Sequence, residues 1–126
     1  MSAAYVDTSV LVALAFEEPE GAGMSNRLEA FSRLLSSNLL EAELRAACAR
    51  EARGFSDSLV ANLTWVFPDR SLAPELAAAL SAGYLRGADL WHVAAALYIA
   101  PSPRELCFLT LDERQRSAAA TLGFRI

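Results

Sequence analysis

Two short apolar segments, one near each end of the chain, lead into aspartate residues. Residues 3–6 run directly into Asp7, and residues 106–110 are followed by Asp112. Each segment has the length and apolar content of a buried strand, and segments with helical spacing occupy the chain between them. Strands that alternate with helices form a parallel sheet with helices on both faces. The sequence therefore predicts an α/β fold with a central parallel sheet of about four to five strands.

Helical spacing and turn residues set the other expected elements. Helices are expected over residues 10–16, 24–35, 39–53, 56–63, 74–82, 90–100 and 113–122, and further strands over residues 64–67 and 124–126. Glycine and proline end helices, and Gly54 and Pro101 follow two of these segments. The chain has 126 residues and no linker-like stretch, so a single domain over residues 1–126 is expected.

The absence of particular side chains excludes several classes of enzyme. All 11 basic residues are arginine, and His92 is the only histidine. A chain without lysine cannot form a Schiff base or supply the phosphate-binding lysine of a P-loop. The Gly-x-Ser-x-Gly elbow of a serine hydrolase is missing, and Cys48 and Cys107 have no partners at zinc-site spacing. The catalytic groups that remain are carboxylates. With 15 acidic and 11 basic residues the net charge is −4, which disfavours tight nonspecific binding of nucleic acid by charge alone.

Three of the five aspartates lie where elements of the predicted fold begin or end. Asp7 and Asp112 follow strands at their carboxyl ends, the edge at which open parallel sheets bind ligands. Asp89 stands at the start of the helix over residues 90–100, where the helix dipole favours a negative side chain. Taken singly, Asp7 and Asp89 would be helix caps and Asp112 a turn residue. Taken together, in a chain without other catalytic groups, they favour one shared acidic site.

Four segments carry these acids in a fixed order. They are Tyr5-Val6-Asp7-Thr8-Ser9, an acidic residue on the third helix, Arg86-Gly87-Ala88-Asp89-Leu90-Trp91-His92-Val93-Ala94-Ala95-Ala96 and Leu109-Thr110-Leu111-Asp112. Their order and spacing resemble the PIN domain, and in particular the VapC toxins of bacterial toxin–antitoxin modules. The resemblance covers nearly the whole chain. It implies a PIN-like fold and an endoribonuclease in which Asp7, Asp89 and Asp112, with a helix glutamate, hold Mg²⁺ or Mn²⁺.

Two glutamates compete for the fourth position. Glu41 and Glu43 flank the apolar stripe of their helix on opposite sides at similar angles, so a helical wheel does not decide between them. In the family, a serine like Ser37 lies six residues before the acid, which points to Glu43 and leaves Glu41 as a surface charge. By the same likeness, Ser9 beside the first aspartate and Thr110 before the last would each hold a carboxylate or a metal-bound water.

An all-carboxylate site suits divalent metal chemistry. Mg²⁺ prefers oxygen ligands, and a bound ion activates water for attack on phosphorus. Such a site needs no lysine or histidine. Because water and not the 2′-hydroxyl is the attacking group, the expected products carry a 5′-phosphate and a 3′-hydroxyl. His92 is expected to be a packed structural histidine. Arg86, Arg114 and Arg116, which lie near the acids in the sequence, are candidate phosphate contacts.

The expected function is therefore metal-dependent cleavage of RNA by a toxin whose partners are a VapB-like antitoxin and a second copy of the chain. The longest apolar runs, residues 10–16 and 93–100, are shorter than the ~18–20 residues that span a bilayer, and no signal peptide is recognised, so a cytoplasmic protein is expected.

One alternative is a PIN-like scaffold that binds a partner protein while its acids are idle. A phosphatase of the haloacid-dehalogenase type is disfavoured, because Ser9 stands where that family needs a second aspartate.

Overall fold

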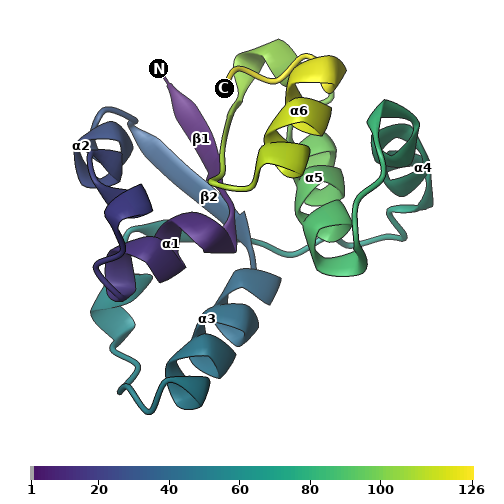
Figure 1. Ribbon diagram of the computed structural model, residues 1–126. Coiled ribbons are helices and arrows are strands. Elements are labelled where there is room, and N and C mark those ends of the chain that lie inside the picture. Colours follow the sequence, from purple (N-terminus) through teal and green to yellow (C-terminus); the bar gives the residue numbers. More distant parts are fainter. Residues whose placement is uncertain (1) are drawn as a thin grey trace.

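Parallel strands form the centre of the computed structural model, which describes residues 2–126 (Figure 1). The strands are β1 (Ala3–Val6), β2 (Arg33–Ser37), β3 (Leu63–Val66) and β4 (Cys107–Leu109), and they lie in the order β3-β2-β1-β4. The register pairs Tyr5 of β1 with Leu35 on one side and Phe108 on the other. Parallel neighbours need a crossover connection, and each crossover here contains at least one helix. The predicted α/β fold with a parallel sheet is confirmed.

Helices cover both faces of this sheet. The helices are α1 (Thr8–Ala15), α2 (Met24–Glu29), α3 (Leu39–Arg50), α4 (Ala73–Ala82), α5 (Gly87–Ile99) and α6 (Glu113–Leu122). Side chains alternate between the faces of a strand, so Tyr5 joins one core cluster with Val93 of α5, and Val6 joins another with Val10 of α1. Figure 1 shows α1 and α2 on one side of the strands, with α5 and α6 on the other. Each face therefore has its own buried apolar cluster.

The helix expected over residues 24–35 is wrong in its second half. Helix α2 ends at Glu29, and the chain continues as strand β2. The apolar residues at Met24, Leu28 and Leu35 fit a helical period, but Leu35 lies in the sheet, where it pairs with Tyr5 and is 7% exposed. Pairing with two strands that are distant in sequence overrides the local period.

Smaller differences concern the ends of elements. The helix expected over residues 39–53 ends at Arg50, and the one expected over residues 56–63 is only a 3₁₀ turn, Asp57–Leu59. The terminal strand expected over residues 124–126 is reduced to one bridge beside β4. None of these differences moves an acid of the predicted site. Within residues 2–126, no helix has the length and hydropathy needed to cross a membrane.

Candidate functional site

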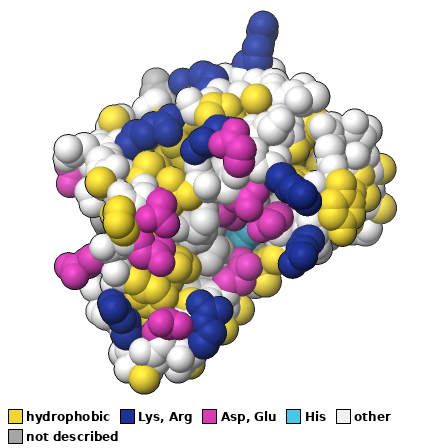
Figure 2. Space-filling view, in the orientation of Figure 1, with side chains coloured by type: hydrophobic (Ala, Val, Ile, Leu, Met, Phe, Trp, Pro, Cys, Tyr) yellow, Lys and Arg dark blue, Asp and Glu magenta, His cyan; other side chains and the backbone are white. Residues whose placement is uncertain are grey.

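The carboxyl edge of the sheet brings the predicted acids to one region. Asp7 follows β1 and caps α1, and Asp112 follows β4 and caps α6. Asp89 lies in the first turn of α5, and Glu43 lies on α3, which begins after β2. Figure 2 shows acidic side chains gathered on this face next to the single histidine. Four separate elements therefore each present one of the predicted carboxylates here.

Asp7 is the most buried of these acids, with 3% of its surface exposed. The backbone N–H of Ser9 donates to its Oδ2 at 3.1 Å, and the Thr110 hydroxyl reaches the same oxygen at 3.1 Å. The side-chain amide of Gln115 donates to the other oxygen, Oδ1, at 3.1 Å. The Thr110 hydroxyl also lies 2.6 Å from Oε1 of Gln115, so its one proton is shared between two acceptors. The N–H groups of Ser9 and Gln115 still give each Asp7 oxygen a donor of its own, and these hydrogen bonds fix the plane of the carboxylate. Ser9, through its backbone N–H, and Thr110, through its hydroxyl, therefore both contact the first aspartate.

Glu43 and Glu41 point to different surroundings. The Thr8 hydroxyl donates to Oε1 of Glu43 at 2.7 Å, and Nε2 of His92 lies 2.7 Å from the same oxygen. Glu41 instead pairs with Arg45 at 2.8 Å on the surface of α3. Burial tends to raise the pKa of Glu43, but the hydrogen bonds from His92 and Thr8, with the electrostatic effect of His92, outweigh it and lower that pKa. Of the two glutamates, the structure brings only Glu43 to the other acids.

The charges of the site act on Asp89. Burial raises the pKa of this carboxyl, and the negative charges of Asp7, Asp112 and Glu43 raise it further, while His92 acts in the opposite direction. The helix dipole at the first turn of α5 favours the negative form, yet the shift is upward overall. The acids are therefore close enough to repel one another.

This repulsion gives an expected pH dependence of stability. Because its pKa is raised in the folded state, Asp89 binds a proton more tightly there than in the unfolded chain, so stability falls as the pH rises above the ordinary value of 3.8. Asp89→Asn removes the charge, and we expect it to melt at a higher temperature than wild type at pH 7 in a chelator. The difference should shrink as the pH is lowered towards 3.8. A matched control is Asp57→Asn on the surface, and a lower melting temperature for Asp89→Asn would contradict the repulsion.

The four acids offer the kind of ligand atoms that a hard divalent cation binds. All four acids offer carboxylate oxygens, which Mg²⁺ and Mn²⁺ prefer, and a cation among them would offset their repulsion. Within residues 2–126 no three acidic, histidine or cysteine side chains already converge closely enough to hold an ion. Glu43 faces Thr8 and His92, and the Asp112 carboxylate accepts from the backbone N–H of Gln115 at 2.8 Å. The residues fit such an ion by their chemistry, and hydrogen bonds hold the carboxylates of Asp7, Glu43 and Asp112 in their present orientations.

Gln115 contacts two of the acids, and sequence reasoning did not identify it. It is fully buried, and its amide donates both to Asp7 and to the backbone carbonyl of Asp89 at 3.2 Å, so it joins α6 to two acids. A signal was present, because Gln115 shares the buried face of α6 with Ala118 and Ala119, where an apolar residue is usual. A polar residue on an apolar helix face near a predicted site indicates a hydrogen-bonding role.

The other candidate residues are divided between the core and the surface. His92 is fully buried, as expected of a packed histidine, and it also contacts Glu43. Arg116 pairs with Glu113 and donates to the carbonyl of Thr110, and these two contacts hold its guanidinium. Arg86 and Arg114 are exposed.

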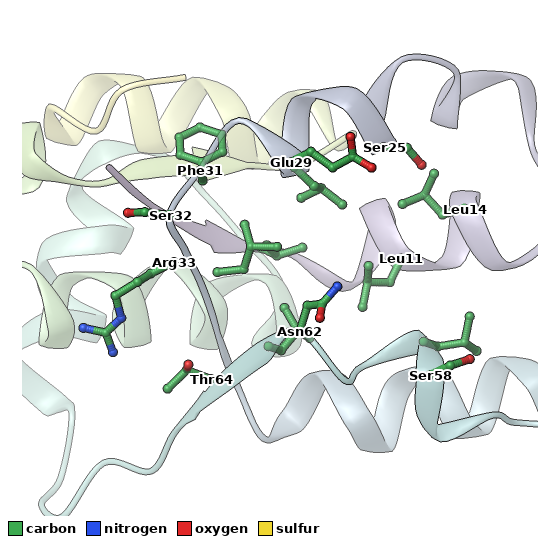
Figure 3. A pocket seen from close by; sticks show the side chains of 15 residues that line it. Leu11, Leu14, Ser25, Glu29, Phe31, Ser32, Arg33, Ser58, Asn62 and Thr64 are labelled. Atoms are coloured by element: carbon green, nitrogen blue, oxygen red, sulfur yellow. The ribbon is translucent and has the colours of Figure 1, made fainter. Parts of the chain in front are cut away.

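A cavity of about 590 Å³ lies away from the acids (Figure 3). Its walls include Leu11 and Leu14 of α1 and Phe31, and Figure 3 shows Asn62 and Thr64 on the side of β3. None of the four acids lines this cavity. It is therefore a separate feature of the surface.

Comparison with known proteins agrees with this arrangement. The family model described as the PIN domain matches residues 4–120. The chain is also similar to ribonuclease VapC46 of Mycobacterium tuberculosis, with 33% identity over 129 aligned positions that cover all of this chain and 97% of that protein. No solved structure matches the chain. The match over most of the sequence and the full-length relative show that the chain belongs to the PIN-domain family.

Proposed function

We propose that this protein is a metal-dependent endoribonuclease of the VapC type, acting as the toxin of a toxin–antitoxin pair through a single domain. The observation that carries the proposal is the placement of Asp7, Glu43, Asp89 and Asp112 at one edge of the sheet, where burial and the charges of the other three acids raise the pKa of Asp89. A full-length relative named as a ribonuclease supports the same activity. Acids that repel one another are costly to keep unless they do chemistry.

Mg²⁺ or Mn²⁺ is the proposed cofactor, and the four acids would hold it. Such an ion, when bound, activates water and stabilises the leaving oxygen of a phosphodiester. The protein contributes the placement of the ligands. Asp7 is fixed by Ser9, Thr110 and Gln115, and it therefore needs little reorganisation when an ion binds.

The surroundings of the acids fit an RNA substrate. Arg86 and Arg114 are exposed, and they lie three residues before Asp89 and two after Asp112. Figure 2 shows arginine side chains beside the acidic region, where they could contact phosphates on either side of the cleaved bond. His92 is fully buried and cannot reach a 2′-hydroxyl, so we expect water to be the nucleophile and the products to carry a 5′-phosphate and a 3′-hydroxyl.

We propose two protein partners, a VapB-like antitoxin and a second copy of the chain. The proposed location is the cytoplasm, where RNA is made and used. The chain exposes several large apolar side chains that a partner would cover, among them Phe67 and Tyr84, which are 65% and 69% exposed. An antitoxin that placed a basic side chain among the acids would also relieve their repulsion.

The two glutamates of α3 provide a matched test of the nuclease. We expect Glu43→Gln to lower the rate of RNA cleavage in Mn²⁺ by roughly 10–100-fold or more, because Glu43 supplies a carboxylate beside Asp7. Glu41→Gln, on the same helix, should cleave at the wild-type rate, because Glu41 only pairs with Arg45 on the surface. Equal rates for both variants would remove Glu43 from the site. A purified wild type that binds a partner but cleaves no RNA would favour the idle scaffold instead.

A further inference from the structure

A continuous hydrogen-bonded path runs through the core to Glu43. The backbone N–H of Ser37 donates to the Tyr5 hydroxyl oxygen at 3.1 Å. That hydroxyl lies 2.7 Å from Nδ1 of His92, and Nε2 of His92 lies 2.7 Å from Oε1 of Glu43. The path joins β2, β1, α5 and α3, and the side chains of Tyr5 and His92 are fully buried. Packing alone does not require two such short polar contacts on one ring.

The contacts determine which atoms carry the protons. Tyr5 already accepts from Ser37, so its own hydroxyl proton is available for His92 Nδ1. Burial raises the pKa of Tyr5, so the phenol keeps that proton. With Nδ1 as acceptor, the neutral ring carries its proton on Nε2 and donates it to Glu43. In this arrangement every donor of the path has an acceptor.

Thr8 is the second side chain that holds the Glu43 carboxylate. Its hydroxyl lies 2.7 Å from Oε1 of Glu43 and 3.1 Å from Nε2 of His92, so two donors from different helices converge on one oxygen. Oε1 is thereby held, and the second oxygen of Glu43 has no contact of this kind among the described residues. The carboxylate is thus oriented by its protein-facing oxygen.

We propose that His92 is a positioning residue that holds Glu43 in the orientation needed at the acidic site, and that Tyr5 selects the ring nitrogen which makes the contact. The inference rests on the proposed function only in assigning Glu43 to a metal-binding site. In metal sites, donors that orient a ligand from behind typically change metal affinity or activity by 10–100-fold when they are removed. His92 does so here without touching substrate.

The single histidine allows a direct spectroscopic test in the metal-free protein. Long-range ¹H–¹⁵N correlation spectra should show His92 of wild type as one tautomer, protonated on Nε2. Tyr5→Phe removes the donor to Nδ1 while keeping the ring, so a mixture of tautomers should appear. A wild-type ring protonated on Nδ1, or a Tyr5→Phe spectrum that is unchanged, would overturn the role assigned to Tyr5.

Mn²⁺ binding, titrated without RNA, tests the role of His92. The amide nitrogen of glutamine reaches the place of Nε2, so His92→Gln should retain most of the affinity, whereas His92→Leu should bind Mn²⁺ about 10–100-fold more weakly. In a Glu43→Gln background the same change to Leu should have little further effect, because the residue acts through Glu43. Circular dichroism checks folding, and if the Leu variant does not fold, His92→Asn replaces it, since its amide reaches only the Nδ1 position.

Each result decides between the two proposals. Equal Mn²⁺ affinity of the Gln and Leu (or Asn) variants, or an equal loss with and without Glu43, would overturn the positioning role and leave the nuclease proposal standing. A wild type that binds Mn²⁺ with the expected His92 dependence but cleaves no RNA would overturn the nuclease proposal instead.

Discussion

Asp7→Asn is expected to lower the rate of RNA cleavage by more than about 100-fold, since even indirect partners of a metal site affect activity by 10–100-fold. Asp7 is the most buried acid of the site and contacts Ser9, Thr110 and Gln115 through both oxygens. Asparagine keeps the shape and removes the charge. In either orientation, the NH₂ group of the new asparagine faces another N–H donor, that of Ser9 or that of Gln115. Two donors cannot bond to each other, so the side chain loses at least one of these hydrogen bonds.

The same substitution affects stability, so the test needs a fold control. A buried donor left without an acceptor costs on the order of 1–3 kcal/mol. The variant should therefore be assayed well below its own melting temperature, with circular dichroism recorded on the same sample. Asp57→Asn is the matched control, because the Asp57 side chain is 96% exposed and lies 3.9 Å from its nearest partner, Arg45. A folded Asp7→Asn protein that cleaves RNA at the control rate would contradict the assignment of Asp7.

Removal of divalent ions is expected to have the second large effect. A chelator should abolish cleavage, and Mg²⁺ or Mn²⁺ should restore it, because no lysine is present and the single histidine is buried. Ion binding should also stabilise the folded protein by about 2.7 kcal/mol when the ion concentration is 100 times its dissociation constant. Paired melting curves, with chelator and with Mn²⁺, measure this stabilisation.

Asp112→Asn is a matched variant for those melting curves. Asparagine is as good an N-cap as aspartate, so the hydrogen bond from the backbone N–H of Gln115 to residue 112 should survive. One ligand charge is lost, so Mn²⁺ should stabilise this variant much less than wild type. Cleavage that continues in a chelator, or equal stabilisation of both proteins by Mn²⁺, would count against a metal site at Asp112.

The placement of Asp7 and Asp112 at one edge of the sheet was predictable because short parallel strands fix where their carboxyl ends lie. Strands β1 and β4 are adjacent, and the backbone N–H of Asp7 donates to the carbonyl of Leu109 at 2.9 Å, which holds these two ends together. A sequence with two apolar strands, each closing on an acid, therefore predicts that the acids meet. The glutamate was different, since Glu41 and Glu43 lie at similar angles on the helix and only the family spacing separated them. Their contacts, with Arg45 and with His92, now distinguish them.

Strand β2 and the buried polar contacts were not predictable from local pattern. The helical spacing that continues from α2 into β2 is broken by pairing with β1 and β3, strands about 30 residues away in each direction. Gln115 and Tyr5 have their roles because α6, β1 and α5 pack together, and no local window of sequence contains those contacts. Such long-range polar contacts become visible only when the fold is known.

The position of a bound ion is the most direct measurement of the central claim, that Asp7, Glu43, Asp89 and Asp112 form one metal site. Crystals grown with Mn²⁺ and measured for anomalous scattering should show a peak in contact with carboxylate oxygens of Asp7 and of at least one other of these acids. The peak should be lost in Asp7→Asn crystals. A peak elsewhere, or no peak at an Mn²⁺ concentration that supports RNA cleavage, would contradict the claim.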